Sequence, residues 1–122
     1  MTDLQAGKLN VLVCGGRDFS NTAKLFIELD RLHKEQGFYC LIHGAANGAD
    51  TLAGKWAEIN NIAVRAFPAD WKRYGKSAGP IRNRQMLEDG RPDLVIAFRG
   101  GDGTQNMINQ AKRRGVKVVQ IP

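Results

Sequence analysis

The sequence predicts an α/β fold in which a parallel sheet lies between two layers of helices. Short apolar runs alternate along the chain with longer stretches whose apolar residues recur at helical spacing. Several of the apolar runs end in glycine-rich segments that lead directly into a helical stretch. Strands that alternate with helices pair in parallel and carry helices on both faces. We therefore expect a Rossmann-like, doubly wound three-layer sandwich with a five-stranded, mainly parallel sheet in the order 3-2-1-4-5.

Hydrophobic patterning places each element. Strands are expected over residues 9–14, 38–43, 62–67, 93–98 and 116–121, and their continuous apolar character predicts helices on both faces. Helices are expected over residues 21–36, 50–60, 80–88 and 104–114. Gly37 is expected just past the end of the first helix, and Pro80 suits the first turn of the third. The polar segment 70–78 is expected to be irregular.

Length and composition indicate an ordinary globular chain. It has 122 residues, of which 43% are hydrophobic and 25% charged, so we expect an N-terminal tail over residues 1–7 and a single domain over residues 8–122. No apolar run is long enough to span a bilayer, and the first residues lack a signal-peptide pattern. We therefore expect a cytoplasmic protein with no membrane partner.

The two cysteines, Cys14 and Cys40, lie in apolar runs without a CxxC spacing or a suitably spaced pair of histidines. This pattern predicts two reduced thiols in the core, no metal site and no cofactor. The net charge of +6 favours an anionic partner, which the composition leaves open as a phosphate ligand, a nucleotide or a nucleic acid.

Three of the expected strands end in glycine loops, over residues 14–19, 43–50 and 98–104. Each loop leads into a helix, so all three are expected at one edge of the sheet, two of them beside the point where the strand order reverses. Glycine lets backbone amides approach a ligand closely, and a helix N-terminus attracts anions. Tight turns alone are the alternative explanation. Neither GxGxxG beside that point nor GxxxxGK[ST] occurs, which disfavours a dinucleotide fingerprint and a P-loop.

Four motifs in order carry a resemblance to a known family. They are Gly15-Gly16-Arg17-Asp18-Phe19, His43-Gly44 with Gly48-Ala49-Asp50, Gly79-Pro80-x-Arg82-Asn83 with Met86, and Gly100-Gly101-x-Gly103-Thr104. Over about residues 9–120 the chain resembles the SLOG superfamily, most nearly its stand-alone YspA-like branch. The resemblance implies a Rossmann-like domain that binds nucleotides or nucleotide-derived ligands, and a homodimer is common in this superfamily.

One position departs from the enzymes of that superfamily. The phosphoribohydrolases carry GGxGTxxE, whose final glutamate serves catalysis, whereas this chain has Met107 at that place. A thioether cannot act as a general base or stabilise an oxocarbenium ion. Because Met107 shares a helix face with Ile108 and Ala111, a contact in the core is the main expectation, and a place in the pocket wall is the alternative.

Charged and aromatic residues near the expected crevice complete the candidate site. Carboxylates there could accept ribose hydroxyls or stabilise turns and helix N-termini, and the arginines could meet phosphate or solvent. An aromatic in the basic segment 71–76 could stack on a base or dock as a lid. The expected ligand-binding residues are Gly15, Gly16, Arg17, Asp18, Gly44, Gly48, Asp50, Trp71, Arg82, Asn83, Gly100, Gly101, Asp102, Gly103 and Thr104, with no catalytic residue among them.

Three functions compete on this pattern. We expect a domain that binds or senses a small nucleotide or nucleotide-derived ligand in a glycine-loop crevice. A phosphoribohydrolase-like enzyme acting on nucleoside monophosphates is one alternative, and Met107 disfavours it in its familiar form. A single-stranded nucleic-acid binder that uses the basic segment is the other, although no extended basic stripe lies outside residues 72–84. A homodimer is left open.

Overall fold

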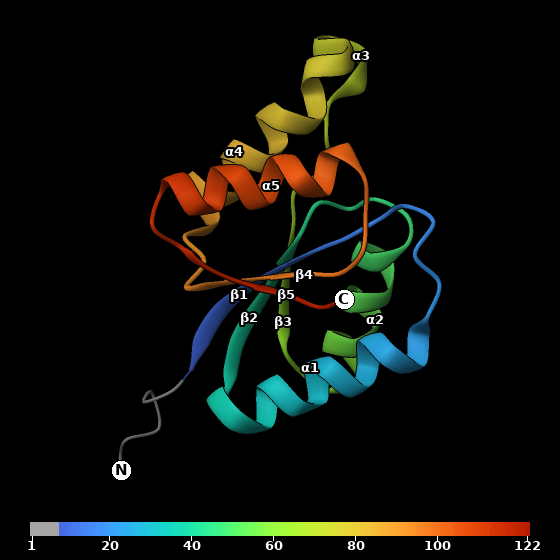
Figure 1. Cartoon of the computed structure of the whole chain (residues 1–122), viewed down its shortest axis with the longest axis vertical. Coiled ribbons are helices and arrows are strands. Elements are labelled where there is room, and N and C mark those ends of the chain that lie inside the picture. Colours follow the sequence, from blue (N-terminus) through green and yellow to red (C-terminus); the bar gives the residue numbers. More distant parts are fainter. Residues whose placement is uncertain (1–7) are drawn as a thin grey trace.

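A five-stranded parallel sheet forms the centre of the molecule, with its strands in the order β3-β2-β1-β4-β5, as expected (Figure 1). The computed structural model describes residues 8–122. Its elements are β1 (Leu9–Cys14), α1 (Thr22–Gln36), β2 (Phe38–His43), α2 (Ala49–Ile59), β3 (Ala63–Ala66), α3 (Trp71–Tyr74), the 3-10 turn η1 (Gly75–Ser77), α4 (Ala78–Gly90), β4 (Leu94–Ala97), α5 (Asp102–Arg113) and β5 (Lys117–Gln120). The expected tail over residues 1–7 lies outside the described residues.

Two helix layers cover the sheet, and the alternation of side chains along the strands explains why. In β1, Val11 and Val13 join the core beneath α1 and α2, whereas Leu12 and Cys14 join the core beneath α4 and α5. Figure 1 shows α1 and α2 on one side of the sheet and α4 and α5 on the other. The doubly wound arrangement therefore brings the carboxyl ends of all five strands to one edge.

The expectation that every strand is covered on both faces is wrong for the edge of the sheet. All four residues of β3 are exposed, and Val64 keeps 40% of its surface accessible. β5, at the opposite edge, is exposed at both ends. Helices are about twice as wide as the spacing between strands, so two helices on each face cover the middle strands and leave the edges open.

The segment 70–78 is helical rather than irregular. Asp70 caps the short helix α3 by accepting a hydrogen bond from the Arg73 amide at 3.1 Å, and η1 then leads into α4. Pro80 lies in the first turn of α4, as expected. In Figure 1, α3 projects away from the sheet, above the N-terminal end of α4.

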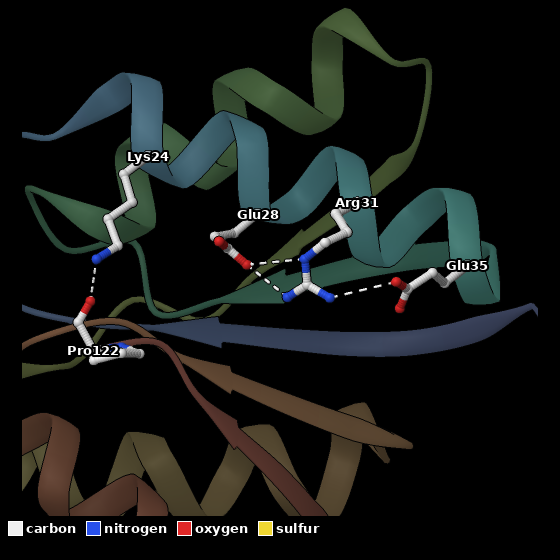
Figure 2. Close-up of polar contacts among 5 residues, drawn as sticks. All are labelled: Lys24, Glu28, Arg31, Glu35 and Pro122. Carbon is white, nitrogen blue, oxygen red and sulfur yellow. Dashed lines mark hydrogen bonds and ion pairs between the residues drawn. The ribbon is translucent and has the colours of Figure 1, made fainter.

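Helix α1 begins and ends where the sequence predicts, within one residue. The Asn21 side chain accepts from the Lys24 amide at 3.1 Å, and Gly37 ends the helix with φ of 75°. On its outer face Arg31 pairs with Glu28 at 2.6 Å and with Glu35 at 3.4 Å (Figure 2). Such exposed pairs contribute little to stability.

Lys24 on the same helix donates to the main-chain oxygen of Pro122 (Figure 2). This contact joins α1 to the last described residue of the chain, just beyond β5. Among residues 8–122, no helix combines the length and the apolar character needed to cross a bilayer. Cys14 and Cys40 are both free and buried, as expected of core thiols.

One buried polar contact fixes α2 against α1. The Trp56 side chain is only 1% exposed, and its indole Nε1 donates to Asp30 Oδ1 at 2.7 Å. The indole also meets His33 and Phe38 edge to face, with ring centroids 5.7 and 5.8 Å away. A buried indole N–H needs an acceptor, and Asp30 supplies it from the surface.

Replacing Asp30 with alanine should lower the free energy of unfolding by about 1–3 kcal/mol, because it leaves the indole N–H without its acceptor. Asp30→Asn keeps a side-chain oxygen and should lose less. Urea unfolding followed by circular dichroism measures both variants. An Asp30→Ala protein as stable as the wild type would show that water replaces the carboxylate at no cost.

Candidate functional site

A cavity of about 540 Å³ opens at the carboxyl ends of β1 and β4, where the order of the strands reverses. Ligands of doubly wound sheets bind at this place. Most of the predicted site residues line the cavity: Gly15, Gly16, Arg17, Asp18, Asp50, Trp71, Arg82, Asn83, Gly101, Asp102, Gly103 and Thr104. It is also lined by Cys14, Ala46, Lys76, Gly79, Pro80, Met86 and Asn106, which were not predicted as site residues.

Three predicted site glycines, Gly44, Gly48 and Gly100, do not line the cavity and instead lie close to other atoms of the protein. A Cβ on Gly48, whose φ is 76°, would lie 2.2 Å from the Gly16 carbonyl oxygen. A Cβ on Gly100 would lie 2.1 Å from Thr104 Oγ1 and 2.7 Å from the Gly16 amide nitrogen. A Cβ on Gly44 would lie 2.5 Å from Arg82 Nη1. Gly48 and Gly100 are needed because main-chain atoms occupy the space of a side chain, whereas at Gly44 that space is taken by the end of the flexible Arg82 side chain.

Gly101 and Gly103 differ from those glycines, because a Cβ on either would meet nothing within 4 Å. Gly101 has φ of −103°, so no left-handed conformation requires glycine there. These two residues leave the start of α5 open to the cavity, and no side chain caps this helix. Within residues 8–122, the amides of Asp102, Gly103 and Thr104 have no hydrogen-bond partner. Unpaired amides at a helix N-terminus are donors that an anion could accept from.

The second glycine loop is filled by a side chain of its own helix. Asp50, in the first turn of α2, accepts hydrogen bonds from the amides of Gly44 at 3.0 Å and Ala46 at 3.2 Å. Ala45 between them has φ of 58°, which turns both amides toward one point. The structural alternative for Asp50 was a charge or a cap at the helix N-terminus. Asp50 is the acidic residue of the first turn of α2, but its side chain makes no capping hydrogen bond to that helix.

Burial sets the protonation of Asp50. Only 6% of the residue is exposed, and desolvation raises the pKa of its carboxyl group to about 6. The hydrogen bonds from Ala46 and Gly44 and the charges of Arg82 and Arg17 oppose this rise without cancelling it. Burial and the nearby Asp50 also raise the pKa of the Cys14 thiol well above its ordinary range, so this thiol stays protonated.

Arg82 is the central cation of the cavity. It is partly buried in α4, its Nη1 donates to the Gly44 carbonyl and its Nε donates to Asn83 Oδ1 at 3.1 Å. Within residues 8–122, no carboxylate lies within 4.0 Å of its guanidinium. Burial lowers the pKa of Arg82, partly offset by the charge of Asp50. An anion in the cavity would stabilise a half-buried guanidinium that has no ion-pair partner.

The side chain of Asn83 forms hydrogen bonds that hold α4 against α5. Its Nδ2 donates to the Gly103 carbonyl at 3.2 Å and to Asn106 Oδ1 at 3.1 Å. Gln110 donates to the same Asn106 oxygen at 2.8 Å and to the Pro80 carbonyl at 3.1 Å. This network ties α4 to α5, so the amide of Asn83 is largely used within the protein.

Trp71 and Arg17 face one another at the rim. The Arg17 Cζ lies 4.9 Å from the centroid of the indole ring, and Trp71 remains 47% exposed. Trp71 and Tyr74 are both partly exposed and Trp71 lines the cavity, so stacking on a base and docking as a lid on the sheet edge both stay predictions. Asp18 and Asp102 also lie exposed along the lining of the cavity.

Three other residues considered from the sequence, Met107, His43 and Arg99, do not line the main cavity. Met107 is fully buried in the core beneath α4 and α5, which confirms the core contact. His43 accepts from the Ala45 amide through Nδ1 at 2.9 Å, and burial lowers its pKa. Arg99 lines a separate hollow beside β5 rather than the main cavity. No group of three or more potential metal-ligating side chains occurs in the part of the chain that the structure describes.

Ionising Asp50 should cost stability between about pH 4 and pH 6. Its pKa rises from 3.8 to about 6 on folding, so the folded state binds the proton more tightly and stability falls as pH rises through this window. Asparagine at this position does not ionise. The free energy of unfolding of Asp50→Asn minus that of the wild type should therefore increase by about 2 kcal/mol between about pH 4 and pH 6.5. Urea unfolding across this range measures the difference.

A difference between Asp50→Asn and the wild type that stays the same across this pH range would mean that Asp50 titrates in the folded protein as it does in the unfolded chain.

Comparison with known proteins agrees with the motifs. Gene 61 protein of Mycobacterium phage D29 is 33% identical to this chain over 119 residues, which cover 91% of this chain and 94% of the phage protein. No solved structure matches the chain. A sequence profile of the YspA, cpYpsA-related SLOG family, YAcAr, matches residues 9–74, a span that ends before Arg82 and the third glycine loop. This match over more than half of the sequence shows that the chain belongs to the YspA, cpYpsA-related SLOG family.

Proposed function

We propose that the main cavity binds a phosphate-bearing nucleotide or nucleotide-derived ligand. Arg82 carries the proposal, because its half-buried guanidinium has no carboxylate within ion-pair distance among residues 8–122 and lines the cavity. The uncapped N-terminus of α5 opens into the same cavity and adds amide donors. Membership of the SLOG family suggests a nucleotide-related role, which agrees with this electrostatic arrangement.

The remaining lining residues suit the other parts of a nucleotide. The exposed indole of Trp71 offers a face on which a base could stack, with Arg17 beside it. The carboxylates of Asp18 and Asp102 are exposed acceptors for ribose hydroxyls. Asp50 keeps the second loop closed, so the phosphate is assigned to Arg82 and the start of α5.

Binding or sensing fits these residues better than hydrolysis of a nucleoside monophosphate. The position that carries the catalytic glutamate in the phosphoribohydrolases is Met107, which is 0% exposed and does not line the cavity. Neither of the exposed carboxylates, Asp18 and Asp102, sits on that helix face. Single-stranded nucleic acid, a homodimer and a cytoplasmic location stay predictions from the sequence.

Removing the guanidinium of Arg82 should weaken ADP binding by about 1.5–3 kcal/mol, the contribution of a hydrogen bond to a charged group, or roughly 10- to 150-fold. Isothermal titration calorimetry on Arg82→Ala measures the loss. Arg99→Ala is the matched control, because that arginine lines a different hollow. Unchanged affinity with lowered stability would assign Arg82 to the fold.

The third glycine loop offers a paired test of binding against folding. Gly101→Val should fold normally, because its Cβ meets nothing within 4 Å, and should lose ADP binding because the side chain covers the start of α5. Gly100→Ala should instead lower the free energy of unfolding by about 1–3 kcal/mol, since its Cβ overlaps Thr104. Calorimetry and thermal melting distinguish the two effects. Normal ADP binding by Gly101→Val would contradict a ligand at this loop.

A further inference from the structure

A second hollow of about 310 Å³ adjoins the main cavity at the carboxyl ends of β2 and β3. We call it the side cleft. Its own walls are the loop after β2, with Gly44 and Asn47, and the segment after β3, with Pro68 and Ala69. Both hollows fall within the size range of small-molecule sites. On the β2 and β3 side of the sheet, the main cavity therefore has a neighbouring compartment.

The stack of Arg17 on Trp71 divides the two compartments. Both residues line the main cavity and also the side cleft. The guanidinium lies 4.9 Å from the indole centroid, and the two residues come from segments that are distant in the sequence, the loop after β1 and the start of α3. Ala46 and Arg82 are the other residues that line both hollows.

Arg82 lies at the boundary between the same two compartments. It lines both hollows, and its Nη1 bond to the Gly44 carbonyl anchors it where the side cleft begins. A guanidinium has five N–H donors, and the described hydrogen bonds use two of its nitrogens, Nε and Nη1. Donors therefore remain on a side chain that lines both hollows, and they suit an anionic group shared by both.

We propose that the side cleft is a second subsite and that the ligand has two ring-bearing groups joined by a phosphate or pyrophosphate linker. The linker lies against Arg82 beneath the Arg17–Trp71 stack, one group occupies the main cavity, and the other enters the side cleft between Asn47 and Ala69. This inference rests on the proposed nucleotide function of the main cavity. It predicts a two-part nucleotide-derived ligand rather than a mononucleotide.

Calorimetry with matched ligands tests the second subsite. The probes are ADP, ADP-ribose and diadenosine diphosphate, of which the last two add a ring-bearing group beyond the pyrophosphate. At least one of these two should bind the wild type ten or more times more tightly than ADP. If both bind no better than ADP, the second subsite is refuted while the proposed function stands. If no probe binds, ADP included, the proposed function itself fails.

Variants of the side cleft test whether the tenfold gain in affinity over ADP arises there. Ala69→Phe fills the cleft without lining the main cavity, so it should abolish the tenfold gain and change ADP affinity less than twofold. Ala63→Phe, at an exposed position at the start of β3, is the matched control. Asn47→Phe, which lines the same cleft, replaces Ala69→Phe if thermal melting shows that variant to be unfolded.

Two further results would overturn the proposal. A gain that survives in both cleft variants would place the second group elsewhere. Tighter binding of a 3′–5′-linked adenylyl dinucleotide than of either pyrophosphate probe would instead favour a single strand of nucleic acid that passes through both hollows.

Discussion

The Gly16 amide donates to the Arg99 carbonyl at 2.8 Å, and the geometry of the whole site depends on this approach of one main chain to another. The Gly16 carbonyl also accepts from the Ala49 amide at 3.1 Å, so a single residue joins the loops after β1, β2 and β4. Side chains at Gly48 or Gly100 would separate them. Because the loops meet backbone to backbone, the first turns of α2 and α5 both border one cavity.

The loops after β2 and β4 both present amide donors near the cavity, and the protein uses part of these donors for itself. Asp50 takes up the amides of Gly44 and Ala46 with its buried carboxylate. The start of α5 has no such internal acceptor among the described residues. The two loops therefore differ in function although both are glycine-rich. One is a closed structural turn that supports Arg82 through the Gly44 carbonyl, and the other is open to the cavity.

Local patterns in the sequence predicted the fold well because parallel strands and their helices are defined by short-range periodicity. Gly37 at the end of α1 and the strand order are examples. The closed second loop could not be predicted, because the left-handed Ala45 and the inward carboxylate of Asp50 depend on tertiary packing. Exposure of β3 was missed for a related reason, since its apolar composition resembles that of a covered strand while coverage depends on how far the helices extend. Asn106 has no signal in the sequence, because its role arises only when α4 and α5 lie side by side.

The polar network between α4 and α5 explains how Arg82 can be held at the cavity without an ion pair to any described carboxylate. Asn83, Asn106 and Gln110 satisfy one another and the Pro80 and Gly103 carbonyls, and no buried side-chain polar atom among the described residues lacks a partner. This network fixes α4 on α5 and therefore fixes the backbone of Arg82. The hydrogen bond from Arg82 Nη1 to the Gly44 carbonyl fixes its guanidinium as well. A carboxylate partner would neutralise the guanidinium and compete with an anionic ligand. Neutral amides can position the helix without that competition, so the positive charge of Arg82 stays available in the cavity.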